Sequence, residues 1–137
     1  MKLSNTTEYS LRILGFMAKD SSRMYSAKYL VKALNISDKY LRRLMTNLSK
    51  AGFIESKQGR TGGYVFSRPT ENIYVIEIIN SIEGTDYFDQ CVMGFEECSD
   101  ENPCALHLKW TLVRDNMTEI FKTTSLKDMA NKDIDKF

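Results

Sequence analysis

The stretch SDKYLRRLMTNLSKAGFIESKQGRTGGYVF, residues 37–66, decides the fold because a helical pattern runs directly into a hairpin pattern. Its first part repeats apolar side chains at helical spacing on one side only, at Leu41, Leu44, Met45 and Leu48. Ser37 is suited to cap the start of this helix. Gly52 is suited to end it, because a positive φ angle costs little only for glycine. The sequence therefore predicts an amphipathic helix between these two residues.

The second part of the stretch predicts a β-hairpin with a charged tip. Residues 53–57 and 64–66 are typical of two strands, and three glycines allow a sharp connection between them: Gly59, Gly62 and Gly63. Arg60 lies among these glycines. A loop that cradles a phosphate is the alternative, but such a loop needs a helix directly after its glycines. Tyr-Val-Phe is a poor helix start, so the hairpin is favoured.

A second helix precedes this stretch. Ser26 is suited to cap it, and its apolar residues follow the i, i+3, i+4, i+7 spacing of one helix face: Ala27, Leu30, Val31 and Leu34. A short break at residues 35–36 then joins it to the helix after Ser37. Two helices joined by a tight turn are typical of a helix-turn-helix, and a hairpin directly after them is a wing. With a further helix over residues 7–19, we expect a mainly α fold with a small β-hairpin wing.

The charge distribution indicates a polyanion partner for the first half of the chain. Residues 1–70 hold 13 Lys or Arg and 4 Asp or Glu, whereas residues 71–137 hold 6 and 14. A solvated charged surface is the alternative. Arg60 suits a narrow, electronegative minor groove, and the polar side of the helix after Ser37, Asn47 included, can reach phosphates and base edges. We therefore predict contacts with double-stranded DNA from Ser37, Lys39, Tyr40, Arg42, Arg43, Arg60, Thr61, Gly62 and Gly63.

The second half of the chain, residues 71–137, predicts helices around a cysteine-containing loop at 85–104. Thr70 is expected to cap a helix that ends at Gly84, and a longer helix is expected over 105–124. The apolar residues of the longer helix are spaced by 4, 3, 4 and 3, at Leu106, Trp110, Val113, Met117 and Ile120. Such a heptad seam needs another helix, and a homodimer, which would read a palindromic operator, supplies one. Packing onto the chain's own core is the alternative. Residues 125–137 are polar and are expected to fray.

Three cysteines and the single histidine of the chain lie close together in sequence. Six residues separate Cys91 from Cys98, five separate Cys98 from Cys104, and His107 follows three positions later. If the helix begins near residue 103, Cys104 and His107 share one face of it. Thiols and imidazole form a soft donor set that suits zinc or an iron–sulfur cluster. Zinc knuckles have shorter gaps between ligands, so a larger inorganic group is favoured; a thiol-based redox switch and idle thiols are the alternatives.

Other features exclude classes of function. No apolar run approaches the length of a membrane helix, and there is no signal segment, so the cytoplasm is the expected compartment. No Ser-His-Asp arrangement can be argued from one histidine, so an enzyme is not expected. Glu8, near the start of the first helix, is either a favourable partner of the helix dipole or a further candidate ligand.

These residues together resemble the Rrf-two family of IscR-, NsrR- and CymR-type transcriptional regulators, over nearly the whole chain. Four segments carry the resemblance: MKLSNTTEYSLRIL, ISDKYLRRLMTNLSKAGFIESKQGRTGGY, the three-cysteine loop and CALHLKW. The resemblance implies a homodimeric winged helix-turn-helix repressor or activator, with a long C-terminal dimerisation helix. It also implies an iron–sulfur cluster that senses cluster supply, nitric oxide or redox state. Because such clusters are lost in air, an aerobic preparation can lack it.

The resemblance also implies the ligands. Cys91, Cys98 and Cys104 correspond to the thiolate ligands of the family's cluster. His107 matches the fourth ligand of the cluster-supply regulators, whereas Glu8 lies near the acidic ligand of nitric-oxide-sensing members, which the other subunit can supply. The first cysteine gap is one residue longer than the five-residue form of the cluster-supply regulators, so 2Fe–2S and 4Fe–4S clusters both remain open. Members that act in cysteine metabolism lack a cluster, and they also lack this cysteine set.

Overall fold

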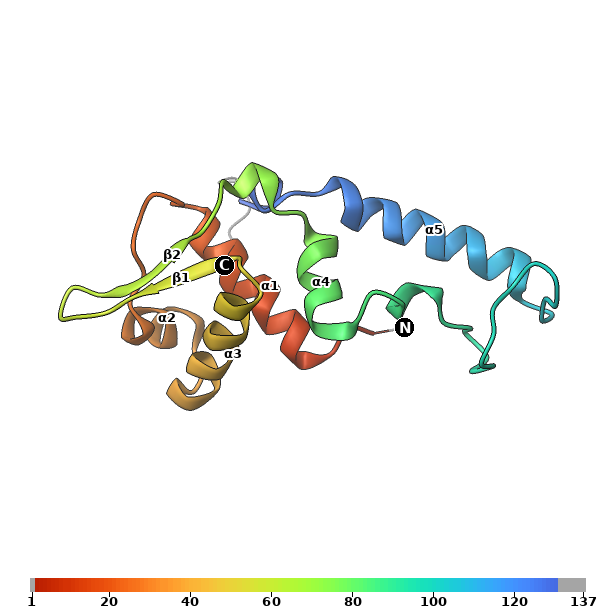
Figure 1. Cartoon of the computed structure of the whole chain (residues 1–137), viewed down its shortest axis with the longest axis horizontal. Coiled ribbons are helices and arrows are strands. Elements are labelled where there is room, and N and C mark those ends of the chain that lie inside the picture. The colour runs from red at the N-terminus through yellow and green to blue at the C-terminus, as the bar shows by residue number, and fades with distance from the viewer. Residues whose placement is uncertain (1, 131–137) are drawn as a thin grey trace.

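The computed structural model describes residues 2–130 and shows an elongated, mostly helical chain with a hairpin at one end (Figure 1). The helices are α1 Asn5–Ala18, α2 Ala27–Leu34, α3 Asp38–Lys50, α4 Val75–Glu83, α5 His107–Thr123 and α6 Leu126–Met129. Strands β1 Ile54–Lys57 and β2 Gly63–Phe66 form the hairpin, and short 3-10 helices occupy Thr70–Asn72 (η1) and Tyr87–Asp89 (η2). The predicted fold class, mainly α with a β-hairpin wing, is confirmed. We call residues 5–66 the winged-helix body.

The two predicted serine caps set the start of the helix-turn-helix pair. The Ser26 hydroxyl accepts a hydrogen bond from the Tyr29 N–H at 3.1 Å, and the Ser37 hydroxyl accepts one from the Tyr40 N–H at 3.3 Å. Between the helices, Asn35 adopts a left-handed conformation with a φ of 52°. Asparagine tolerates this conformation better than most residues, so the chain can reverse within a very short break.

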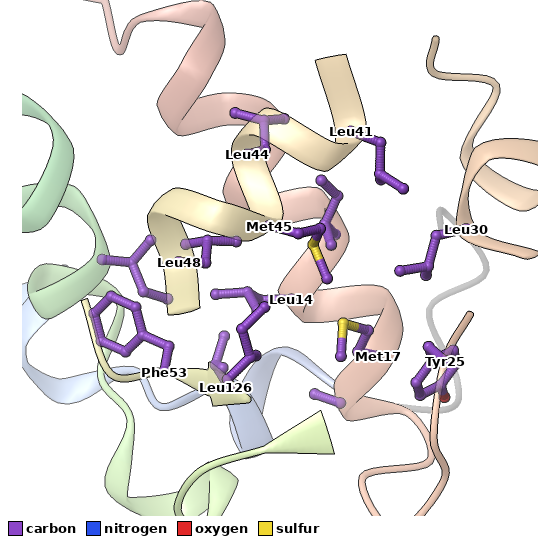
Figure 2. Close-up of a cluster of buried hydrophobic side chains, with 14 of the residues drawn as sticks. Leu14, Met17, Tyr25, Leu30, Leu41, Leu44, Met45, Leu48, Phe53 and Leu126 are labelled. Atoms are coloured by element: carbon purple, nitrogen blue, oxygen red, sulfur yellow. The ribbon is translucent and has the colours of Figure 1, made fainter. Parts of the chain in front are cut away.

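The core of the winged-helix body forms where the apolar faces of α1, α2 and α3 meet (Figure 2). Leu41, Leu44, Met45 and Leu48 of α3 are buried, as their spacing predicted. They pack with buried residues of the other two helices, among them Leu14, Met17 and Leu30. Burying this stripe leaves the opposite, basic side of α3 in solvent.

The hairpin is antiparallel and is extended on one side by an isolated bridge. Ile54 pairs with Phe66 and Lys57 with Gly63. Tyr25 exchanges two backbone hydrogen bonds with Tyr64, at 3.0 and 2.8 Å, which fastens the wing to the segment before α2. A Cβ at Gly63 would lie 2.5 Å from the Tyr25 carbonyl oxygen, so only glycine allows this close approach. The bridge at Tyr64 therefore holds the wing close to its turn, while turn residues 58–61 stay exposed.

The start of α4 differs from the prediction. Thr70 does not cap α4 but begins η1, and α4 starts five residues later at Val75. There the Glu77 carboxylate accepts a hydrogen bond from the Tyr74 N–H at 2.8 Å, which supplies the cap. Gly84 ends the helix with a φ of 97°, as predicted.

The segment after α5 also differs from the prediction of a frayed end. Ser125 caps the short helix α6, and Leu126 is fully buried in the same core as α1 and α3. The Leu126 N–H donates to the Ile73 carbonyl at 2.8 Å, and the Val75 N–H donates to the Thr124 carbonyl at 2.9 Å. The rest of the segment expected to fray, residues 131–137, lies outside the described residues.

Helix α5 extends away from the winged-helix body and divides its predicted seam between two environments (Figure 1). Met117 packs onto a second small core formed by Val75, Ile79 and Phe88, so part of the seam serves the chain's own core. The remaining exposed members of the seam are Leu106, Val113 and Ile120. Among residues 2–130, no helix combines the length and the apolar character needed to span a lipid bilayer.

Candidate functional site

The exposed side of α3 presents most of the residues predicted to contact DNA. Lys39, Tyr40 and Arg43 line a small hollow of about 310 Å³ together with Ser37. The Arg43 guanidinium lies 5.3 Å from the centre of the Tyr40 ring, a cation–π contact. The structure thus places these four residues together at the N-terminal end of α3.

A stack of aromatic and basic side chains ties this end of α3 to α1. The ring of Tyr40 meets that of Tyr9 edge to face, with ring centres 5.6 Å apart. Arg12 lies on Tyr9, 5.2 Å from its ring centre. These contacts link α1 to Tyr40 and, through it, to Arg43.

A groove of about 520 Å³ separates α3 from the wing, and we call it the wing groove. The predicted residues Arg42, Arg60, Gly62 and Gly63 line it, whereas Thr61 is an exposed turn residue that does not. The sequence reasoning missed other polar residues that line the groove, among them Ser26, Lys28, Thr46 and Lys57. Lys28 could have been found from the sequence. A positive charge in the first turn of a helix interacts unfavourably with the helix dipole, so a lysine there indicates a role other than stabilising the helix. This groove presents the basic groups that a nucleic acid backbone requires.

The cysteine loop, residues 85–104, lies at the opposite end of the chain from the wing, beside the start of α5 (Figure 1). Two contacts fasten it. The Phe88 ring packs on Phe121, with ring centres 5.7 Å apart, and the Trp110 indole N–H donates to the Gln90 carbonyl at 3.2 Å. The loop is therefore anchored at two points along α5, Trp110 in its first turn and Phe121 near its C-terminal end, before it reaches the first cysteine.

Backbone N–H groups surround the sulfur of Cys91. A hydrogen bond from the Phe95 N–H contributes most to lowering the pKa of the Cys91 thiol, and the N–H groups of Met93 and Gly94 act in the same direction against the effect of burial. Positive φ at Gly94 lets the chain turn tightly enough for this arrangement. Hydrogen bonds of this kind stabilise a thiolate, which is the form that ligates metals.

Cys98 and His107 approach each other directly. The Cys98 sulfur lies 3.4 Å from Nδ1 of His107, and Nε2 of His107 lies 2.8 Å from a carboxylate oxygen of Asp100. The histidine is 3% exposed. Burial raises the pKa of the Cys98 thiol, a nearby Cys91 charge adds to this, and Arg114, at 3.9 Å from the sulfur, opposes it. Sequence reasoning missed Asp100 and Arg114, since neither belongs to the cysteine motif.

Cys104 and His107 do not share a helix face as the sequence suggested. Helix α5 begins at His107, so Cys104 precedes it in a turn, where the His107 N–H donates to the Cys104 carbonyl at 3.0 Å. The turn still brings Cys104 close enough to influence the Cys91 thiol. All three thiols and the histidine thus gather at the N-terminal end of α5.

The donor set fits an iron–sulfur cluster. Three free thiols, one imidazole with its second nitrogen held by a carboxylate, and N–H groups around a sulfur are the features that such clusters use. Within residues 2–130, no three of the acidic, cysteine or histidine side chains already converge as a closed site for a single metal ion. Glu8 lies in the first turn of α1, a separate element from the cysteine loop.

The comparisons with known proteins agree with this architecture. The family described as Rrf2, iron-dependent transcriptional regulator, matches residues 3–132. The regulator CymR of Bacillus subtilis is 32% identical over 96% of this chain and 91% of its own length, and NsrR of Bacillus licheniformis is 34% identical over 77% and 71%. The solved structure of the Bacillus subtilis CymR, described as a global cysteine regulator, aligns with a TM-score of 0.78 and 31% identity over 95% and 96%.

Fold, basic helix and wing define the chain as a winged helix-turn-helix transcriptional regulator that binds DNA, and not an enzyme. The chain belongs to the Rrf2 family. The similar proteins include two different regulators of this family, CymR and NsrR. Membership of the family therefore does not by itself assign a role to the cysteine loop.

Proposed function

We propose that this chain forms a homodimer that binds a palindromic operator with an affinity set by an iron–sulfur cluster. The proposed ligands are Cys91, Cys98 and Cys104 with His107, or with Glu8 of a second subunit, as the fourth. The observation that carries the proposal is the gathering of three thiols and the buried histidine at one end of α5, with backbone N–H groups around Cys91. When bound, such a cluster supplies a centre that responds to redox state, nitric oxide or iron supply.

Ligation would fix the cysteine loop against α5. Cys91 and Cys98 lie on the loop, whereas His107 is the first residue of the helix. The loop already contacts α5 through Phe88 on Phe121 and through Gln90 on Trp110. Holding the thiols against His107 would therefore add a third connection and limit the conformations of the loop.

Two connections lead from the loop to the winged-helix body. The Tyr87 hydroxyl, in η2, donates to the Lys2 carbonyl at 2.6 Å, just before α1. At the other end of α5, the backbone of residues 124–126 bonds to Ile73 and Val75, at the start of α4. Since α1 carries Tyr9, which packs on Tyr40 of α3, a change at the loop can reach the DNA-binding helix.

The proposed dimer uses the exposed row on α5. Leu106, the N-cap residue of α5, and Val113 and Ile120 within the helix are spaced by seven residues, so they lie on one side, and all three are exposed. A second copy of α5 would cover them. Half-sites of a palindrome lie about 34 Å apart, one turn of DNA, so a small change in the angle between subunits would alter operator affinity.

The test is purification without oxygen, followed by absorbance spectroscopy, iron and sulfide analysis and a duplex-binding assay. Wild-type protein is expected to be coloured, to contain iron and sulfide, and to bind duplex DNA with a different affinity after the cluster is removed. Cys98→Ala is expected to lose the colour while retaining the helical content of the wild type. Colourless wild-type protein without iron or sulfide would contradict the proposal.

A second candidate function is a thiol-based or zinc-bound DNA-binding repressor without iron. Two observations favour it: the Cys91 thiolate is stabilised by N–H groups beside two further thiols, and CymR is among the similar proteins. Elemental analysis of the same oxygen-free protein separates the candidates, because iron with sulfide, zinc, or no metal each corresponds to a different mechanism. Reversible oxidation of Cys91 in metal-free protein, read by mass spectrometry, would support a thiol switch.

A further inference from the structure

Asp38 and Arg42 form an ion pair near the start of α3. Nε of Arg42 donates to both carboxylate oxygens of Asp38, at 3.1 and 3.0 Å. The two residues are one helical turn apart, and their side chains are 58% and 59% exposed. Exposed pairs of this kind contribute little to stability, about 0.3 to 0.5 kcal/mol. A stability role therefore does not account for the pair, and its position beside the wing groove suggests another.

The pairing leaves a defined part of the guanidinium for a ligand. Arginine carries five N–H groups in a rigid fork, and Asp38 takes the one on Nε. No residue in the described range, 2–130, is recorded as accepting a hydrogen bond from Nη1 or Nη2. These two terminal groups can donate side by side to a pair of acceptors, while the carboxylate restricts the rotation of the side chain about its long axis.

We propose that Arg42 reads a guanine in the major groove end-on, through Nη1 and Nη2, and that Asp38 is the residue that positions it. O6 and N7 of guanine are two neighbouring neutral acceptors, and bidentate donation by arginine matches their spacing. The proposal rests on the proposed role of α3 as the helix that enters the major groove. It adds to that role a specific base and a residue that acts without touching DNA.

The alternative target of Arg42, a backbone phosphate, fits the pair less well. The Asp38 carboxylate lies 3.0 Å from the guanidinium and offsets its charge, which weakens attraction to an anion. The same carboxylate weakens the hydrogen bonding of Arg42 to a neutral base edge much less. Other cations line the wing groove, among them Lys28 at the start of α2 and Arg60 in the hairpin turn, and neither forms an ion pair within the described residues. They suit phosphate or minor-groove contacts.

Arg43 provides an internal contrast on the same helix. Its guanidinium lies on the Tyr40 ring, not beside a carboxylate, so its full positive charge remains available. We expect Arg43 to add affinity with weak dependence on sequence, and Arg42 to add preference at one position. The two arginines are adjacent in the chain and nevertheless differ in this testable way.

The experiment is a selection from a library of duplexes with a randomised central segment, using the full dimer purified without oxygen. Wild-type protein, Arg42→Ala, Asp38→Ala and Asp38→Asn are compared. Glu55→Ala is the matched control, since Glu55 forms an equally exposed ion pair with Lys57 on the wing, at 3.2 Å. Each protein is also titrated with a non-selected duplex over a range of salt concentrations.

Wild-type protein is expected to enrich guanine at one position of each half-site. Arg42→Ala and Asp38→Ala should both lower that preference by about tenfold and leave the other positions unchanged. Asp38→Ala should bind the non-selected duplex at least as tightly as wild type, with a salt slope steeper by about one, because the released Arg42 can neutralise a phosphate. Asp38→Asn retains one acceptor, so its guanine preference should lie between those of wild type and Asp38→Ala. Glu55→Ala should keep the guanine preference of wild type.

Two results would overturn the inference. Retention of the guanine preference in Asp38→Ala would show that the carboxylate does not position Arg42. An equal loss for all duplexes in Arg42→Ala would make that residue a phosphate contact. A loss caused only by a less stable α3 would lower affinity for every duplex and would not act at one base. Wild-type protein that binds duplexes but selects no sequence would refute base reading by α3, whereas failure to bind any duplex would refute the DNA-binding role itself.

Discussion

Replacing Leu126 by alanine would test whether the end of the chain holds α5 to the winged-helix body. Leu126 is 0% exposed and packs in the core of α1 and α3, although it lies in a helix of only four residues. Fully buried Leu→Ala changes cost about 2 to 5 kcal/mol, because both the transfer energy and the new cavity count. We expect about 3 kcal/mol here. For a domain of this size, that loss lowers the Tm by roughly 10 °C.

Thermal unfolding of Leu126→Ala and wild type is to be followed by circular dichroism at one protein concentration, since formation of the proposed dimer would make the Tm depend on concentration. Leu108→Ala is the matched control. Leu108 is 76% exposed, and it lies on the far side of α5 from Leu106, because two residues turn a helix by about 200°. The control is expected to change stability by less than about 0.5 kcal/mol.

The outcome that would refute this reasoning is a Leu126→Ala protein that melts within about 2 °C of wild type, since a shift that small corresponds to less than about 1 kcal/mol. Leu126 would then not be part of the core. The backbone bonds of residues 124–126 to Ile73 and Val75 would lose their anchor, and with them one of the two connections between the cysteine loop and the DNA-binding helix.

Three further perturbations test the site and its supports. Arg60→Ala should weaken duplex binding by about tenfold and lower the salt slope by about one, measured by fluorescence anisotropy; unchanged binding would remove the wing tip from the interface. His107→Ala and Glu8→Ala should differ in visible absorbance and in the rate of cluster loss without oxygen, and an effect in neither would exclude both as the fourth ligand. Glu83→Gln should destabilise the fold at pH 7 by about 1 to 2 kcal/mol. Burial acts to raise the pKa of Glu83, but hydrogen bonds from Ser4 and Thr7 outweigh it and lower the pKa. The stabilisation is therefore present above the ordinary value of 4.5 and is lost as the pH falls through the lower folded value. Denaturant unfolding at pH 7 and about pH 3 checks this, and an equal difference at both would contradict it.

The parts of the fold that could be predicted from the sequence depend on local chemistry. Ser26 and Ser37 cap their helices because a hydroxyl and an N–H two or three residues later need no distant partner. The buried face of α3 follows from spacing alone. Gly63 was predicted to lie in the hairpin connection, whereas it is the first residue of β2 and pairs with Lys57. The reason that only glycine fits there, the closeness of the Tyr25 carbonyl, involves a residue far away in sequence.

The incorrect predictions share a dependence on contacts between distant segments. Thr70 resembles a helix cap, yet α4 starts five residues after it, at Val75, and is capped by the Glu77 carboxylate. The polar composition after residue 124 concealed Leu126, whose burial depends on a pocket formed by α1 and α3. Met117 matched the heptad seam, and it packs on apolar residues of η2 and α4 in its own chain, which was the alternative to a second subunit. No local pattern records these surfaces, so sequence alone could not have found them.

The cysteine site shows the same division between chemistry and geometry. Residue types and spacing identified the donors, but the groups that decide how they act come from elsewhere: Asp100 orients His107, and Arg114 reaches Cys98 from the second turn of α5. With Nε2 held by Asp100, Nδ1 is the nitrogen that faces the sulfur of Cys98. An imidazole fixed in this way can ligate only from the side of the thiols. This orientation supports the proposal of His107 as the fourth ligand, and Glu8, in the first turn of α1, is the alternative.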